Sequence, residues 1–179
     1  MQTAAFAHPG RNIEALQIQQ GISAADFGAG SGHYTLLFAQ AVGEAGRVYA
    51  VDVQADLLRR LKNEAQKKGY ENVETILGDI ARAHGTKLRS RCVDMVLMSN
   101  VLFQLEHPLK AFEEARRILK LDGRLIVIDW SDSFRSLGPA KRHVYRREQA
   151  LQDAKAARFE FADDFAAGAH HYGLIFVPV

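Results

Sequence analysis

Short apolar runs alternate with helix-forming segments along most of the chain. The apolar runs predict strands over 22–27, 47–51, 73–77, 93–98 and 124–130, and the intervening segments predict helices over 31–41, 54–68 and 108–119. The helices are indicated by apolar residues at helical spacing. Alternating strands and helices of this kind build a parallel α/β sheet with right-handed crossovers. In such a sheet, ligands bind just beyond the carboxyl ends of the strands.

The last part of the chain departs from this alternation. Residues 143–156 predict a helix, and segments 159–165 and 172–177 predict an antiparallel pair joined near Gly168. Asp122 and Gly123 predict a turn just before the strand at 124–130. Because 179 residues amount to one ordinary domain, we expect a single domain over 1–179.

The composition excludes several classes of protein. Apolar residues make up 47% and charged residues 25% of the chain, which is typical of a globular protein. The net charge of +2 gives no reason to expect nucleic acid or an anionic membrane as a partner. The single cysteine, Cys92, allows neither an intramolecular disulfide nor a Cys-based zinc site. No apolar run approaches the ~18 residues of a membrane span, and no signal peptide is evident, so we expect a cytoplasmic protein.

A glycine-rich turn follows the first predicted strand and opens the first predicted helix. It reads DFGAGSG over 26–32. Glycines let the backbone turn tightly and let a ligand approach without a Cβ in the way, and a helix N-terminus adds free N–H groups. The spacing is G-x-G-x-G, whereas the dinucleotide fingerprint G-x-G-x-x-G needs a glycine where this chain has His33. The turn therefore indicates a nucleotide-like ligand and disfavours a nicotinamide cofactor.

Polar side chains follow the next three strands. Asp52 comes after the second strand, where a carboxylate can accept hydrogen bonds from both hydroxyls of a ribose. Asp79 follows the third strand and can accept from the exocyclic amine of adenine, and Ser99 and Asn100 follow the fourth. Because the carboxyl ends of parallel strands meet at one edge of a sheet, we expect these groups to surround one ligand.

The order of these motifs resembles that of the class I S-adenosylmethionine (SAM) methyltransferases. DFGAGSG is similar to the family's first motif, VDV at 51–53 to its ribose-binding motif, and GDI at 78–80 to its adenine-binding motif. VDMVLMSNVLFQLEHP at 93–108 and RRILKLDGRLIVIDW at 116–130 resemble the small-molecule type 11 branch, which includes ubiquinone and menaquinone biosynthesis enzymes. The resemblance implies a three-layer α/β/α sandwich around a seven-stranded, mostly parallel Rossmann-like sheet with an antiparallel last strand.

The resemblance also implies a reaction and a set of cofactor-binding residues. The enzyme would move a methyl group from SAM to a small-molecule acceptor by in-line displacement, leaving S-adenosylhomocysteine. Residues 28–30 would face the methionine part of SAM, Asp52 would hold the ribose, and 79–80 would read the adenine edge. The residues implied to bind the cofactor are Asp26, Gly28, Ala29, Gly30, Asp52, Val53, Gly78, Asp79, Ile80, Ser99 and Asn100.

Catalytic residues are harder to assign, because a general base is required only when the acceptor must lose a proton early. The candidate bases are His33, His107 and the pair at 170–171, since histidine titrates near neutral pH. Asp129, at the end of the fifth predicted strand, is a candidate substrate contact. A purely structural role is the alternative for each of them. No metal-binding spacing is present, and no metal is expected.

Two segments are expected to cover the site: residues 1–20 as an N-terminal lid or extension, and residues 131–147 as a substrate-side insertion. The second segment is locally basic, which fits an anionic substrate or an ordinary solvated helix face. Its basic residues are Arg135, Lys141, Arg142, Arg146 and Arg147. The domain is expected to act as a monomer or a homodimer.

Three other functions stay open. An RNA or protein methyltransferase would present the basic segment as one face beside the pocket. A non-catalytic SAM-binding module would have a pocket sealed against any acceptor. A nicotinamide oxidoreductase is disfavoured by the glycine spacing. The segment SNVL at 99–102 also departs from the Asn/Asp-Pro-Pro-aromatic motif of enzymes that methylate DNA amines, which disfavours that activity.

Overall fold

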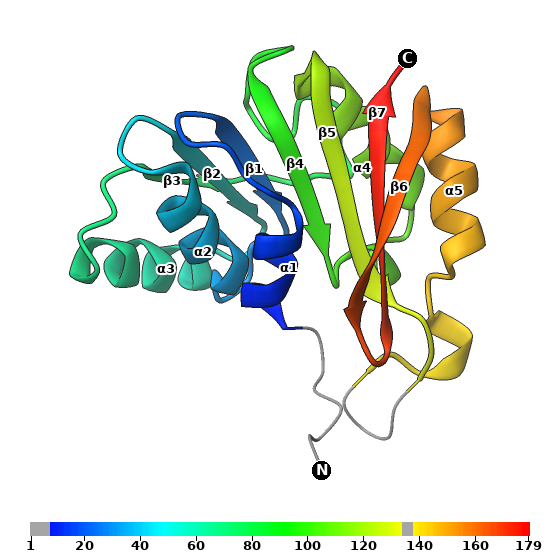
Figure 1. The fold of residues 1–179 in the computed structure, drawn as a ribbon. Helices are drawn as coiled ribbons and strands as arrows, with labels where there is room; N and C mark the ends of the chain where they lie inside the picture. Colours follow the sequence, from blue (N-terminus) through cyan, green and yellow to red (C-terminus); the bar gives the residue numbers. More distant parts are fainter. Residues whose placement is uncertain (1–7, 134–137) are drawn as a thin grey trace.

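The strands form one seven-stranded sheet in the order β3-β2-β1-β4-β5-β7-β6, in a computed structural model that describes residues 8–133 and 138–179 (Figure 1). The first five strands in this order run parallel, and β7 runs antiparallel to both of its neighbours. This confirms the predicted fold class. The strands are β1 (Ser23–Phe27), β2 (Arg47–Asp52), β3 (Val73–Leu77), β4 (Val93–Ser99), β5 (Leu119–Trp130), β6 (Phe159–Gly168) and β7 (His171–Pro178).

Helices cover both faces of the sheet, as a three-layer sandwich requires (Figure 1). Helices α1 (Pro9–Ala15), α2 (His33–Val42) and α3 (Ala55–Lys67) pack on one face, and α4 (Pro108–Ile118) and α5 (Arg147–Ala156) pack on the other. Successive strand residues alternate between the two cores, so Ala24 packs toward α2 while Ala25 packs toward α4. The central strands are therefore apolar on both faces, which explains their nearly continuous apolar runs.

The structure corrects two of the predicted elements. The helix expected over 143–156 begins at Arg147, and a short 3₁₀ turn (Lys141–His143) precedes it. Between them the backbone is extended, which buries the Tyr145 ring and leaves its carbonyl free to accept a hydrogen bond from Tyr172. Residues 122–123, expected to form a turn, lie instead within β5, at the point where its register with β4 shifts.

One helix was not expected from the sequence. Residues 9–15 form α1, with Pro9 at its first turn, a position that proline favours. The buried Asn12 amide donates to the Tyr34 hydroxyl at 2.8 Å and to the Ala167 carbonyl at 3.1 Å, which ties α1 to α2 and β6. The rest of the expected lid, residues 1–7, lies outside the described residues. Within the described part of the chain, none of the helices is long and apolar enough to cross a membrane.

Glu114, on α4, anchors the connection between β3 and β4. Its side chain is 2% exposed and accepts hydrogen bonds from the backbone of His84, from Thr86 and from the Arg117 guanidinium. Burial alone would raise the pKa of Glu114, but the hydrogen bonds from Arg117 and Thr86 outweigh it and lower the pKa to about 2. The ionised carboxylate therefore stabilises the folded state.

We expect Glu114→Gln to lower the free energy of unfolding by about 2–4 kcal/mol, because Arg117 loses its anionic partner in a mostly buried position. Urea unfolding measures this change, with Glu113→Gln on the exposed side of α4 as the matched control. Since the folded-state pKa lies below the ordinary value of 4.5, the stabilisation is present above that pH and is lost as the pH falls toward 2. Equal unfolding midpoints for Glu114→Gln and the wild type would contradict this account.

Candidate active site

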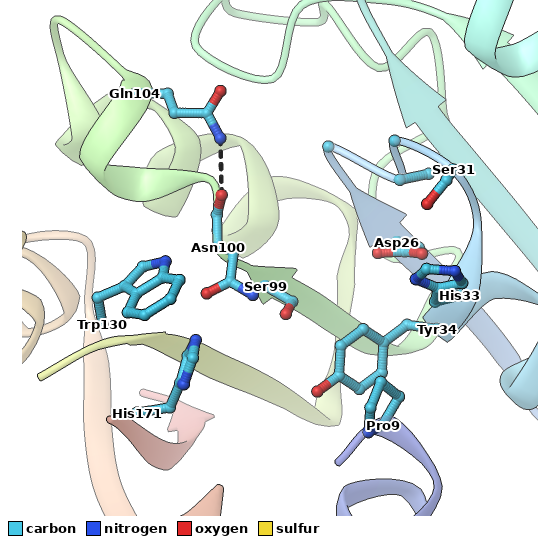
Figure 2. Close-up of a pocket in the computed structure, with 13 residues that line it drawn as sticks. Pro9, Asp26, Ser31, His33, Tyr34, Ser99, Asn100, Gln104, Trp130 and His171 are labelled. Atoms are coloured by element: carbon cyan, nitrogen blue, oxygen red, sulfur yellow. Dashed lines mark hydrogen bonds between the residues drawn. The ribbon is translucent and has the colours of Figure 1, made fainter. Parts of the chain in front are cut away.

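A cavity of about 390 Å³ opens where β1 and β4 lie side by side (Figure 2). The chain leaves β1 into α2 on one face of the sheet and leaves β4 toward α4 on the other, so the two connections diverge. Such a switch point leaves a crevice at the carboxyl edge of a parallel sheet. The cavity is lined by Pro9, Asp26, Gly28, Ala29, Gly30, Ser31, His33, Tyr34, Ser99, Asn100, Gln104, Trp130 and His171.

The glycine loop forms one wall of this cavity. Gly28, Gly30 and Gly32 all have positive φ, at 72°, 54° and 83°, which other residues rarely adopt. A Cβ on Gly28 would lie 2.6 Å from the Val101 side chain, so packing requires a glycine there. A Cβ on Gly30 would meet only the Gly28 carbonyl oxygen, at 3.9 Å. Gly30 therefore faces open space, as a loop that receives a ligand must.

Asp52, at the end of β2, holds this loop in place. One carboxylate oxygen accepts from the Gly30 N–H at 2.9 Å, and the other accepts from the Gln54 N–H at 2.9 Å. Each oxygen keeps a further lone pair for a ligand. The side chains of Val53 and Leu77 are exposed beside it, at the ends of β2 and β3. This pairing of a carboxylate with exposed apolar groups fits a ribose that carries a flat base.

The residues of the third motif lie near these strand ends but do not line the cavity. Asp79 accepts from the Ala81 N–H at 2.9 Å and pairs with Arg82, while Gly78 donates its N–H to the Asp52 carbonyl. Ile80 is buried in the core. The structure thus separates the sequence-predicted cofactor residues into two groups. Asp26, Gly28, Ala29, Gly30, Ser99 and Asn100 line the cavity, and Asp52, Val53, Gly78, Asp79 and Ile80 lie along the ends of β2 and β3.

Asp26, the last-but-one residue of β1, is a buried carboxyl in the cavity lining. Its carboxylate accepts from the Thr35 hydroxyl at 2.6 Å. Burial raises the pKa of Asp26 to about 6, although the hydrogen bond from Thr35 acts in the opposite direction. The group is therefore poised to titrate just below neutral pH.

Trp130 and His171 form the wall opposite the glycine loop. They are paired residues on β5 and β7, and their ring centroids lie 4.3 Å apart with the planes tilted by 40°. Asn100 sits beside them with a positive φ of 54°, and its backbone carbonyl accepts from the Gln104 amide at 2.7 Å. Its own amide oxygen is buried and has no hydrogen-bond partner among the described residues.

The catalytic candidates from the sequence lie in different places. His33 is at the exposed rim of the cavity, on the first turn of α2. His107 is exposed and lines a separate surface hollow beside Lys110, so the structure does not bring it to the cavity. Asp129 is fully buried, where it accepts from the backbone N–H groups of Leu102 and Trp130. Burial raises its pKa to about 7.

Some cavity residues had not been singled out from the sequence. Tyr34 lies within the predicted helix over 31–41, and the structure shows that its hydroxyl accepts from Asn12 and that the residue lines the cavity. Pro9, Ser31 and Gln104 were likewise not expected to line it. For Pro9, the sequence offers one signal: a proline followed by a helix-compatible segment is typical of the first turn of a helix.

Several described residues of segment 131–147 line a second cavity, of about 610 Å³. Tyr172 lines this second cavity and His171 lines the first, so the two cavities are on opposite faces of β7, where successive side chains alternate. Arg147 is paired with Asp164 at 2.9 Å, and Arg135 lies outside the described residues. The basic side chains around the second cavity are Lys141, Arg146 and Arg147.

The sheet order, the glycine loop and the switch-point cavity are those of a Rossmann-like domain that binds a nucleotide-like ligand. The family model of the methyltransferase domain matches residues 18–167. The chain belongs to this family, and SAM is the cofactor that membership implies.

Individual proteins that resemble this chain are also methyltransferases. A crystal structure of a SAM-dependent methyltransferase from Aquifex aeolicus is 27% identical, with a TM-score of 0.87, over 97% of this chain and 90% of that one. A ubiquinone/menaquinone biosynthesis C-methyltransferase of Hahella chejuensis is 28% identical over 66% of this chain and 47% of its own length. A protein-L-isoaspartate O-methyltransferase of Methanococcus maripaludis is 34% identical over 44% of this chain and 37% of its own length. The chain thus spans less than half of these two curated relatives.

We expect Thr35→Val to move the titration midpoint of Asp26 above its value of about 6, because the variant removes the hydroxyl that stabilises the carboxylate. Carbon-13 NMR of the carboxyl group as a function of pH measures the midpoint. Thr75→Val on β3, two strands away from β1, is the matched control and leaves it unchanged. A midpoint in Thr35→Val at or below the wild-type value would show that the hydrogen bond does not act on Asp26 in this way.

Proposed function

We propose that the protein transfers a methyl group from SAM to a small-molecule acceptor. The observation that carries the proposal is the size and lining of the cavity, which measures about 390 Å³ and has the glycine loop on one side and Trp130 and His171 on the other. The methionine end of the cofactor and the reacting end of the acceptor have to share this volume. A small acceptor fits such a space better than a folded protein surface or a nucleic-acid strand does.

The cofactor-binding residues fit SAM in three respects. Asp52 keeps a free lone pair on each oxygen for the ribose hydroxyls, and the exposed Val53 and Leu77 flank it for the adenine faces. Gly30 borders open space at the N-terminus of α2, where free N–H groups favour the carboxylate of the methionine part. Asp79 lies at the end of β3, within the predicted adenine edge.

When bound, SAM supplies a methyl group activated by its sulfonium, which is an excellent leaving group. The chain has to align the acceptor with that methyl group and keep water away from both. The packed, tilted rings of Trp130 and His171 provide a wall for the alignment, and the backbone carbonyl of Asn100 accepts a hydrogen bond from Gln104. We assign these three residues to the acceptor side of the site.

The position of the basic residues argues against an RNA or protein acceptor held by segment 131–147. That alternative requires a basic face beside the cavity, whereas Lys141, Arg146 and Arg147 surround a cavity on the other face of β7. The non-catalytic alternative requires a sealed pocket, whereas His33 forms an exposed rim to the one seen here. The lid role of residues 1–20, the cytoplasmic location, and the monomeric or homodimeric state stay predictions from the sequence.

We expect Asp52→Asn to weaken S-adenosylhomocysteine binding about tenfold or more, because an amide loses the charge-assisted bonds to the ribose and places a donor against either the Gly30 or the Gln54 N–H. Isothermal titration calorimetry measures the affinity. Asp56→Asn, which removes an exposed carboxylate at the start of α3, is the matched control. Unchanged affinity in Asp52→Asn, or tighter binding of NADH than of S-adenosylhomocysteine by the wild type, would refute the cofactor placement.

A further inference from the structure

His171 is a buried imidazole with no partner for either ring nitrogen among the described residues. The residue is only 7% exposed, and it lines the wall of the cavity. A buried polar group without a hydrogen bond costs about 1–3 kcal/mol, so native proteins rarely retain one without a reason. A ligand in the cavity that hydrogen-bonds to the ring would supply that reason.

The orientation of the ring is fixed by the sheet. His171 begins β7 and pairs with Trp130 at the end of β5. The centroids of the two rings are 4.3 Å apart. Figure 2 shows the His171 ring beside Trp130, on the same side of the cavity as Asn100 and across from Ser31 of the glycine loop and His33 of α2. The ring nitrogens therefore belong to the acceptor end of the site rather than to the cofactor end.

The charges around the cavity restrict what can bind there. No lysine or arginine is among the described residues that line it, so an anionic acceptor would lose its hydration without gaining a cationic side chain as partner. The titratable groups that line the cavity with His171 are Asp26, His33 and Tyr34, and the neighbouring His170 is hydrogen-bonded to Asp132. Asp26 is already bonded to Thr35 and buried, which makes it a poor partner for an incoming cation.

The protonation state of His171 also favours an uncharged ligand group. Burial, reinforced by His170, lowers the pKa of His171 to about 4. The ring is therefore neutral at physiological pH, with one nitrogen that donates and one that accepts. The buried amide oxygen of Asn100, which also lines the cavity, is a second acceptor that has no partner among the described residues. Two free acceptors and no cation call for an uncharged ligand group that carries a hydrogen-bond donor.

We propose that His171 accepts a hydrogen bond from an uncharged O–H or N–H group of the acceptor and takes up that proton during methyl transfer. The proposal deepens the proposed methyl transfer and rests on it. In the step, the acceptor oxygen or nitrogen bonds to the methyl carbon as the bond from that carbon to sulfur breaks, and the bonding electrons stay on sulfur. The proton passes from the acceptor to the free nitrogen of His171, which then returns it to water.

The test uses the full chain saturated with S-adenosylhomocysteine and three single-ring probes: phenol, aniline and benzoate. Nitrogen-15 NMR of the histidine rings reports contact with His171, and titration of the signals gives the affinity of each probe. His171→Phe keeps the ring on Trp130 but removes both nitrogens, and His171→Gln keeps a donor and an acceptor but cannot take up the proton. His107→Gln, on an exposed histidine outside the cavity, is the matched control.

We expect phenol and aniline to shift the His171 ring signals and benzoate to bind at least about tenfold more weakly, since it brings an uncompensated charge. His171→Phe should lose phenol affinity about fivefold or more, while it binds S-adenosylhomocysteine as tightly as the wild type does. The control variant His107→Gln should bind phenol with wild-type affinity. Equal phenol affinity in His171→Phe and wild type, or tighter binding of benzoate than of phenol, overturns the hydrogen bond that we propose.

Transfer of a labelled methyl group from SAM to phenol tests the uptake of the proton. We expect kcat of His171→Gln to fall about a hundredfold while KM changes by less than about threefold, the range expected for loss of a general base. An undiminished kcat in His171→Gln would overturn the proton transfer. If the wild type does not bind S-adenosylhomocysteine at all, the proposed function itself fails. If it binds S-adenosylhomocysteine but the His171 variants bind and methylate phenol like the wild type, only this inference is refuted.

Discussion

The divergence of the chain at the ends of β1 and β4 determines where this protein can bind a ligand. These strands are hydrogen-bonded neighbours, yet one leads into α2 on one face of the sheet and the other leads toward α4 on the opposite face. The turns that follow both strands require a left-handed backbone conformation: φ is positive at Gly28 and Gly30 after β1, and at Asn100 after β4. The cavity lies between these two turns, so its existence follows from strand order and its shape follows from the residues that can make the turns.

Hydrogen bonds within the site prepare it before any ligand arrives. Asp52 ties the glycine loop to β2 through the Gly30 N–H, and Thr35 fixes the Asp26 carboxyl beneath it. Across the cavity, the pairing of β5 with β7 holds Trp130 against His171. A site whose walls are set by sheet registers and buried hydrogen bonds loses little entropy on binding, which favours affinity and alignment. The same rigidity leaves both ring nitrogens of His171 without a partner among the described residues, so a ligand in the cavity can bond to them.

The sequence predicted the elements that depend on local pattern and missed those that depend on tertiary pairing. The parallel strands, the glycine loop and the polar groups after the strands are local, and the structure brings them to one edge of the sheet. The start of α5 at Arg147 could not be predicted, because it depends on the Tyr145 carbonyl accepting a hydrogen bond from a distant Tyr172. Likewise His107 and His171 look alike in sequence, and only the register of β7 with β5 separates a surface histidine from a buried one.

A crystal structure of the chain with S-adenosylhomocysteine tests the central claim most directly. The account predicts ribose hydroxyls on the Asp52 carboxylate, adenine between Val53 and Leu77, and the sulfur directed into the cavity toward Trp130 and His171. A ligand bound instead among Lys141, Arg146 and Arg147, or one whose sulfur points away from His171, would contradict it.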